Sequence, residues 1–243
     1  MLLEGKVVLV TGGGSGVGAA IAQQFAQAGA QVVVVGRRAE QLQATRDAIT
    51  SETPVRPIVA DVIDRAQVTA LVQQIVSEFG RLDMLINNAG VNTPERRLEQ
   101  LSSENWDYLM TVNATGAFNM IQAVLPQMRA QGDGLIINIS SISGRRASTL
   151  AGAAYSASKH ALNALSKVVS QEEEQHGIRS TIISPGDINT PLLDKRPVPV
   201  SAEQRAKILQ PDDIAAAALF VATLPAHVSV PELVIKPTGQ MYS

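Results

Sequence analysis

Lys6-Val-Val-Leu-Val-Thr-Gly-Gly-Gly-Ser-Gly-Val-Gly18 is the stretch that decides the fold, because an apolar run leads directly into a cluster of glycines. Residues 6–10 have the pattern of a buried strand. A helix is predicted to follow, with an apolar face formed by Val17, Ala20, Ile21 and Phe25. Glycines let the backbone turn sharply and approach a pyrophosphate, which a helix N-terminus attracts. An ordinary flexible turn is the alternative, but glycines between the first strand and the first helix favour a dinucleotide site.

Strand and helix patterns alternate along the rest of the chain. Strands are predicted at residues 31–35, 55–60, 82–87, 135–140, 180–184 and 233–236. Helices are predicted at residues 65–79, 103–129, 154–174 and 212–224. The strands are continuous apolar runs, as parallel strands covered on both faces are. The order therefore predicts an α/β fold, a doubly wound parallel sheet with helices on both faces and right-handed crossovers.

No linker or internal repeat divides residues 1–243, so a single domain is expected. The longest irregular stretch covers residues 187–210 and is rich in proline. It lies beyond the carboxyl end of the sixth predicted strand, the edge at which such sheets bind ligands. This stretch is the expected substrate lid.

Composition excludes several classes of function. The net charge is −2 and the basic residues are dispersed, which argues against a nucleic-acid or polybasic membrane surface. There is no cysteine, and the three histidines form no recognisable metal site, so no metal is expected. The N-terminus has no signal-peptide architecture, and the apolar runs are too short to span a membrane. A cytoplasmic protein is expected.

Tyr155 and Lys159 stand four residues apart in a predicted helix, so they share one face. A free tyrosine has a pKa near 10, too high for efficient proton transfer at neutral pH. A lysine ammonium about 4 Å from the phenolate contributes roughly 4 kcal/mol at an effective dielectric near 20, enough to bring that pKa to about 7. A surface tyrosine near a solvated lysine is the alternative, and the pair gains weight only from the other motifs.

Arg37 and Arg38 follow the second predicted strand, where enzymes that prefer NAD usually carry an acidic residue. Gly36 precedes them, so no carboxylate is available to hold a ribose 2′-hydroxyl. A guanidinium matches a 2′-phosphate in charge and geometry, so NADP(H) is the expected cofactor. A solvated helix start is the alternative, and it applies more readily to Arg38.

These motifs, with others in a fixed order, resemble the single-domain short-chain dehydrogenase/reductase family over nearly the whole chain. The matching signatures are Thr11-Gly12 with Gly16 and Gly18, Asp61-Val62, Asn87-Asn88-Ala89-Gly90, Asn113, Ser141, Tyr155 with Lys159, Pro185-Gly186 and Thr190. The resemblance implies a Rossmann-like sheet of about seven strands in the order 3-2-1-4-5-6-7. It also implies an NADP-dependent alcohol dehydrogenase or carbonyl reductase that acts on a small molecule.

The resemblance also assigns roles to individual residues. Tyr155 is the expected general acid/base, Lys159 its activator and ribose ligand, Ser141 the group that holds the substrate oxygen, and Asn113 the support of a water relay. Asp61 is expected at the adenine, and Ile188 and Thr190 at the carboxamide. Together with the two arginines, the expected cofactor contacts are Gly12, Gly14, Ser15, Gly16, Val17, Gly18, Arg37, Arg38, Asp61, Val62, Asn88, Ala89, Gly90, Tyr155, Lys159, Ile188 and Thr190.

Two departures from the family pattern leave alternatives open. Ser141 and Tyr155 are fourteen positions apart, one more than is commonest, so the loop between them is expected to bulge. The ending at residues 232–239 lacks the Val-Asp-Gly-Gly of many 3-oxoacyl-carrier-protein reductases, which leaves that activity as an alternative. A cofactor-binding regulatory protein without turnover is a second alternative. A sugar-nucleotide epimerase is disfavoured by the glycine spacing and the short substrate region.

The substrate pocket is expected between residues 91–97, 144–154 and 190–210. Arg96, Arg97, Arg145 and Arg146 lie in or near these loops. They are expected to be solvated, as arginine pairs on loops usually are, and a carboxylate-bearing substrate is the alternative.

A homodimer or homotetramer is also expected, with the tetramer favoured. Two predicted long helices carry apolar surface beyond what one sheet face can cover, at Ala114, Ala117, Ala161, Leu162 and Leu165. Completion of the monomer core is the alternative use of these side chains.

Overall fold

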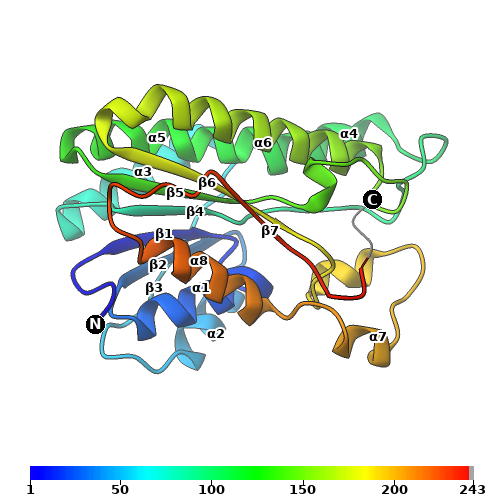
Figure 1. Cartoon of the computed structure of the whole chain (residues 1–243), viewed down its shortest axis with the longest axis horizontal. Helices are drawn as coiled ribbons and strands as arrows, with labels where there is room; N and C mark the ends of the chain where they lie inside the picture. The colour runs from blue at the N-terminus through cyan, green and yellow to red at the C-terminus, as the bar shows by residue number, and fades with distance from the viewer. Residues whose placement is uncertain (241–243) are drawn as a thin grey trace.

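A parallel sheet of seven strands forms the centre of the molecule in the computed structural model, which describes residues 1–240 (Figure 1). The strands lie in the order β3-β2-β1-β4-β5-β6-β7, and every adjacent pair is parallel. Their bounds are β1 Val7–Thr11, β2 Gln31–Gly36, β3 Arg56–Val59, β4 Met84–Asn87, β5 Gly134–Ile139, β6 Ile178–Pro185 and β7 Glu232–Ile235. The predicted strand order is confirmed.

Helices cover both faces of this sheet (Figure 1). One face carries α1 (Gly16–Gln27), α2 (Ala39–Ala48) and α8 (Pro211–Ala222). The other carries α3 (Arg65–Phe79), α4 (Ser103–Met110), α5 (Gly116–Gln131) and α6 (Ala153–Glu173). The short α7 (Ala202–Ala206) lies in the expected lid.

Alternation along β1 shows why the sheet is apolar throughout. Val8 and Val10 belong to the core against α1 and α8, whereas Val7 and Leu9 belong to the core against α3 and α5. Successive side chains of a strand point to opposite faces, so a strand covered on both sides needs an unbroken apolar run. The sequence pattern of the strands thus follows from the two helical layers.

Local signals fix α3 at the predicted bounds. The Asp64 side chain accepts hydrogen bonds from the backbone N–H groups of Ala66 and Gln67, which have no partner inside the helix. Gly80 ends the helix at φ 72°, a left-handed conformation that glycine adopts at low cost. A helix with both signals can be bounded from sequence alone.

The predicted helix at residues 103–129 is interrupted in the structure. A π-helical turn, Thr111–Thr115, separates α4 from α5. Such a turn adds one residue to the helical repeat and is frequent at functional sites. It contains Asn113, one of the expected site residues.

Neither a membrane-spanning helix nor a cluster of metal ligands is found in residues 1–240. No helix in this part of the chain combines the length and the apolar character that a membrane span requires. No group of three or more histidine or acidic side chains there is arranged to hold a metal ion.

Candidate active site

The glycine turn between β1 and α1 leaves the N-terminus of α1 open to an anion. Ser15 occupies the N-cap position but makes no capping hydrogen bond with its side chain, and the first turn contains no acidic residue. The first N–H groups of a helix have no intrahelical partner, and the helix dipole favours negative charge at this end. The turn therefore offers backbone donors and positive potential to a phosphate group.

Gly18 has a different role from the other glycines of the turn. A Cβ atom at this position would lie 2.3 Å from the Gly12 carbonyl oxygen and 2.6 Å from Asn88 Nδ2. Because glycine has no Cβ atom, α1 can pack against the turn and against the segment after β4. Gly18 is also the one expected cofactor residue that does not line the cleft at the carboxyl edge of the sheet.

A cleft of about 380 Å³ lies at the carboxyl edge of the sheet. Apart from Gly18, all the residues expected to contact the cofactor line it. The wall after β4 is held by Thr11, whose Oγ1 accepts hydrogen bonds from the backbone N–H groups of Asn88 (2.9 Å) and Ala89 (3.0 Å). Asn88 Nδ2 in turn donates to the carbonyl of Thr11 at 2.9 Å. These bonds join the ends of two adjacent strands into one rigid wall.

Arg37 and Tyr108 both line the cleft and contact each other. The Tyr108 hydroxyl accepts a hydrogen bond from Arg37 Nη2 at 3.3 Å, and this bond raises the pKa of the guanidinium. Asp61 is close enough for its charge to contribute to that rise in pKa. Sequence reasoning missed Tyr108 because its partner is 71 residues away and no local pattern marks it.

Tyr155 and Lys159 also line the cleft, whereas Ser141 is not among its lining residues. A side-chain hydrogen bond joins Tyr155 to Ser141. Ser140, the neighbouring serine, has a buried hydroxyl with no hydrogen-bond partner among the described residues. The structure thus pairs the tyrosine with Ser141, the serine favoured by the family pattern.

Lys159 is 3% exposed and donates a hydrogen bond to the carbonyl of Ile139 at 2.9 Å. Burial lowers its pKa to about 8. Its Nζ atom lies 5.8 Å from the centre of the Tyr155 ring. The lysine ammonium is therefore a neighbour of the tyrosine that is anchored on the backbone of β5.

The pKa of Tyr155 reflects three opposing influences. Burial raises it above the ordinary value, whereas the Ser141 hydrogen bond and the positive charge of Arg96 lower it. Burial prevails, so the pKa is raised overall, whereas the spacing of Tyr155 and Lys159 predicted that it would be lowered. The structure thereby adds Arg96 to the groups that act on the tyrosine.

Asn113 is buried in the π-helical turn and connects two walls of the site. Its Oδ1 accepts a hydrogen bond from the Val91 backbone N–H at 2.7 Å, and its Nδ2 donates to the Val91 carbonyl and to Ser158 Oγ, each at 3.0 Å. Ser158 donates in turn to the carbonyl of Tyr155 at 2.8 Å. The side chain of Asn113 therefore fixes the positions of Val91 and of the helix that carries Tyr155.

The expected lid has ordered structure of its own. It contains a 3₁₀ turn, Pro191–Lys195, as well as α7. Asp187 and Arg196 form an ion pair at 2.5 Å, and a single β-bridge joins Ile188 to Leu209. The lid thus closes on itself at its base.

The four arginines of the substrate loops are not equivalent. Arg97 is exposed as expected, but Arg96 is only 8% exposed, so the expectation of solvation is wrong for Arg96. Arg145 forms an ion pair with Glu232.

The loop before Tyr155 contains a 3₁₀ turn, Ile142–Gly144, and reaches α6 through Gly152 at φ 88°.

Comparison with known proteins identifies this arrangement. The sequence pattern described as short chain dehydrogenase matches residues 6–198. The chain belongs to the short-chain dehydrogenase family. Among its relatives in this family is an uncharacterized oxidoreductase of Staphylococcus saprophyticus, which is 38% identical over 240 residues that cover 97% of this chain and 98% of the relative.

Solved structures of other short-chain dehydrogenases have the same fold. The closed form of serine dehydrogenase complexed with NADP+ superimposes with a TM-score of 0.88 at 31% identity, covering 98% of this chain and 97% of that one. The 3-ketoacyl-(acyl-carrier-protein) reductase of Brucella melitensis, complexed with NADH, gives a TM-score of 0.87 at 31% identity, covering 97% and 98%. The protein is thus an oxidoreductase of the short-chain dehydrogenase family.

Proposed function

We propose that this protein is an NADP(H)-dependent oxidoreductase that interconverts a small carbonyl compound and the corresponding alcohol. One observation carries the proposal. Tyr155, which is hydrogen-bonded to Ser141, lines the same cleft as Lys159 and Arg37. A proton donor and a phosphate-binding cation in one cavity are what a dinucleotide-dependent carbonyl reductase requires.

The residues of the cleft fit a dinucleotide. The uncapped N-terminus of α1 supplies backbone donors for the pyrophosphate. Arg37, positioned by Tyr108, supplies a cation at the expected site of a 2′-phosphate, and Gly36 leaves no carboxylate there to repel it. NADP(H) is therefore favoured over NAD(H), although the Brucella melitensis relative was crystallised with NADH.

The bound cofactor would supply or accept the hydride, and the side chains of this chain move the proton. In reduction, Ser141 holds the carbonyl oxygen and Tyr155 donates its phenolic proton to that oxygen. In oxidation, the Tyr155 phenolate removes the proton of the alcohol. Because burial keeps the pKa of Tyr155 above its ordinary value, oxidation should accelerate as the pH rises. Lys159 is proposed to hold the nicotinamide ribose.

A 3-oxoacyl-carrier-protein reductase is the second candidate. The likeness to the Brucella melitensis enzyme favours it. The divergent ending at residues 232–239 speaks against it, and serine dehydrogenase is an equally similar relative of different substrate class. A small polar hydroxy compound is therefore the preferred substrate. A regulatory protein that binds the cofactor without turnover remains the alternative from another class.

Activity against a panel of ketones, aldehydes, hydroxy acids and a 3-oxoacyl thioester tests the proposal. NADPH consumption with at least one small carbonyl compound is expected, and it should exceed NADH consumption at equal concentration. NADPH binding without turnover of any compound would instead support the regulatory alternative. Preference for the 3-oxoacyl thioester would support the second candidate.

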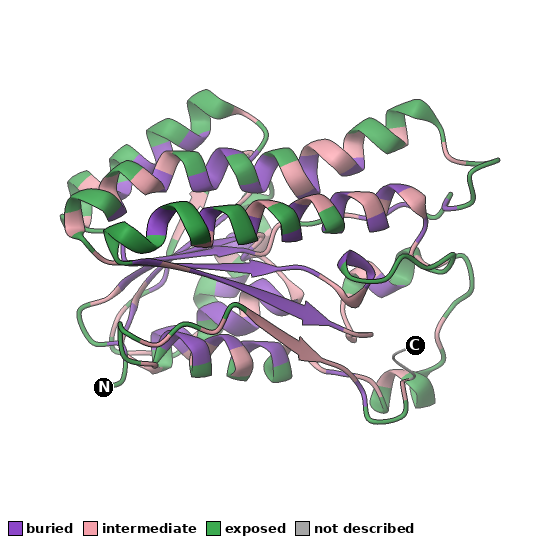
Figure 2. Cartoon of the chain, turned by 45° about the horizontal axis from the view of Figure 1, so that its top comes forward, coloured by how far each residue is buried: buried purple, intermediate pink, exposed green. Residues whose placement is uncertain are grey.

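A homodimer or homotetramer is proposed on the outer surface of α5 and α6 (Figure 2). Ala117 and Leu162 are buried within the monomer, so they complete its core. Phe118 and Val168, on the same two helices, remain 38% and 47% exposed, and the burial colouring shows exposed residues along both helices. Exposed apolar side chains of this kind mark an interface. Light scattering should give a mass of two or four chains at micromolar concentration, and a stable monomer would refute the assembly.

A further inference from the structure

We propose that Arg96 is a positioning residue that holds the three substrate loops together around Tyr155 and keeps an uncompensated positive charge beside the phenol. The inference rests on the proposed function for its kinetic part only. Its structural part concerns the lid and needs no turnover.

The hydrogen bonds of Arg96 reach three separate loops. Its Nε donates to the carbonyl of Thr93 at 2.8 Å, within its own loop. Its Nη1 donates to the carbonyl of Leu150 at 2.8 Å, in the loop before Tyr155, and its Nη2 to the carbonyl of Lys195 at 3.0 Å, in the lid. The planar fork of a guanidinium can satisfy three such acceptors at once, which a lysine ammonium cannot do in the same geometry.

Gly152 makes this close approach possible. It adopts φ 88°, and a Cβ atom there would lie 2.8 Å from the Arg96 Cβ and 3.1 Å from the Arg96 carbonyl oxygen. Any side chain at this position would press against the arginine loop as well as strain the backbone. The loop before Tyr155 and the arginine loop are therefore built to touch.

The charge of Arg96 has no carboxylate partner within residues 1–240: all three acceptors are neutral carbonyls. Burial, together with the charge of Arg196, lowers the pKa of Arg96. A buried cation without a counterion costs free energy. Besides its three hydrogen bonds, the guanidinium therefore brings an uncompensated positive charge to the junction of the loops, and this charge has a second role.

The second role of the Arg96 charge is its effect on Tyr155. The positive charge of Arg96 lowers the pKa of the phenol and so opposes the effect of burial. The ammonium of Lys159 is bound to the carbonyl of Ile139 and lies 5.8 Å from the centre of the same ring. Arg196 is itself paired with Asp187, and among the described residues Arg96 is the cation whose charge lowers the pKa of the phenol.

Three variants and one control separate the two roles. Arg96→Gln removes the charge and the fork, whereas Arg96→Lys keeps the charge and loses the fork. Gly152→Ala keeps Arg96 intact but pushes the loops apart. Arg97→Gln is the matched control, because Arg97 is the adjacent arginine, is 78% exposed and forms an ion pair with the exposed Glu99.

Hydrogen exchange of the wild type and variants tests the loop contacts without substrate. Faster exchange is expected at residues 187–210 and 145–152 in Arg96→Gln, Arg96→Lys and Gly152→Ala, and unchanged exchange in Arg97→Gln. Exchange that is unchanged in all three variants would overturn the structural part, whatever the enzyme's activity.

The pH dependence of kcat/KM for alcohol oxidation tests the charge. In Arg96→Gln the alkaline limb should move upward by about one pH unit, and KM should rise by about tenfold, while the Kd of NADPH stays within about twofold. Arg96→Lys should raise KM but restore the wild-type pH limb. Equal pH profiles for Arg96→Gln and wild type, or equal shifts in the Gln and Lys variants, would overturn the electrostatic part.

Discussion

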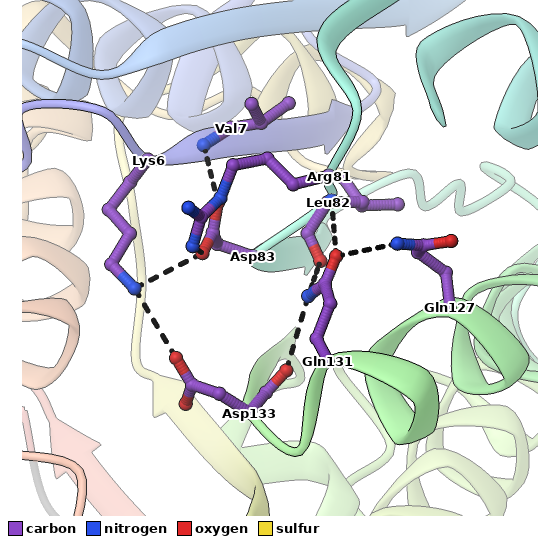
Figure 3. Close-up of polar contacts among 8 residues, drawn as sticks. All are labelled: Lys6, Val7, Arg81, Leu82, Asp83, Gln127, Gln131 and Asp133. Atoms are coloured by element: carbon purple, nitrogen blue, oxygen red, sulfur yellow. Dashed lines mark hydrogen bonds and ion pairs between the residues drawn. The ribbon is translucent and has the colours of Figure 1, made fainter. Parts of the chain in front are cut away.

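Buried charged side chains occur at both edges of the same sheet, but only those at the amino edge are paired with groups of opposite charge. At the amino edge, the side chain of Asp83 is only 2% exposed, and it is paired with two cations and a backbone N–H group (Figure 3). It accepts hydrogen bonds from Lys6 Nζ at 3.1 Å, from the Val7 backbone N–H at 2.8 Å and from Arg81 Nε at 2.8 Å. At the carboxyl edge, Lys159 and Arg96 are nearly as buried, yet both donate to neutral carbonyls.

The difference separates stability from function. Burial alone would raise the pKa of the Asp83 carboxyl, but the bonds from Arg81, Val7 and Lys6 outweigh burial and hold that pKa below its usual range. A buried charge with partners of this kind ties β1 to the start of β4. The cations of the carboxyl edge instead keep positive potential available where a dinucleotide and an oxygen substrate are expected to bind.

The largest effect on stability is expected from Asp83→Asn. The change leaves Lys6 and Arg81 without their buried anion, and loss of one partner of such a cluster costs about 3 kcal/mol of unfolding free energy. Denaturant unfolding measures the loss. Asp133→Asn is the matched control, because Asp133 contacts the same Lys6 but is 39% exposed, and its loss should cost less than about 1 kcal/mol.

Acid titration sharpens the same prediction. Because the pKa of Asp83 is lowered by folding, its stabilising contribution is present above the unfolded pKa of about 4 and is lost as the pH falls through the acid range. The stability difference between wild type and Asp83→Asn should therefore shrink below pH 4. A difference that stays constant down to pH 2 would show that the carboxylate charge is not the cause.

Lys159→Met should have the opposite effect on stability. Folding lowers the pKa of Lys159 to about 8, so the buried charge is a penalty at neutral pH. The variant should be at least as stable as wild type at pH 7, although its turnover is lost. Below pH 8 the penalty is present in full, and it fades as the pH rises toward the ordinary lysine pKa of about 10.4. Thermal unfolding at pH 7 and pH 10 measures this, and clear destabilisation at pH 7 would contradict it.

The smallest of these effects is expected from Arg37→Ala. Arg37 is exposed and donates a hydrogen bond to the Tyr108 hydroxyl, so the free energy of unfolding should change little. The Kd of NADPH should rise at least tenfold, because a charge-assisted contact to a phosphate is lost. The Kd of NADH should change by less than about threefold. Equal losses for both cofactors, or a wild-type preference for NADH, would contradict the assignment of Arg37.

Sequence alone predicted the features that local patterns determine. The strand order came with the family resemblance, and the bounds of α3 follow from Asp64 and Gly80. Helix α2 was missed because its apolar face is sparse: only Leu42 and Thr45 are buried in it. The π-helical turn around Asn113 interrupts a helix whose sequence pattern continues without a break.

Contacts between distant loops could not be predicted in this way. Arg96 and Arg97 are adjacent and chemically identical, yet one is buried and the other exposed. The difference is made by the carbonyls of Leu150 and Lys195, which are 54 and 99 residues away along the chain. The site residues that carry family motifs were therefore found from sequence, whereas Arg96 and Tyr108 needed the fold.

Tyr155→Phe tests the central claim most directly, with Tyr108→Phe, a change at the other tyrosine that lines the cleft, as the matched control. NADPH binding, followed by fluorescence, and kcat for carbonyl reduction should be measured on the same preparations. For Tyr155→Phe we expect a Kd within about twofold of wild type and a kcat lower by about 10²–10⁴-fold, as loss of a general acid produces. Tyr108→Phe should keep its kcat at saturating NADPH. A Tyr155→Phe variant with near wild-type kcat would contradict the proposed mechanism.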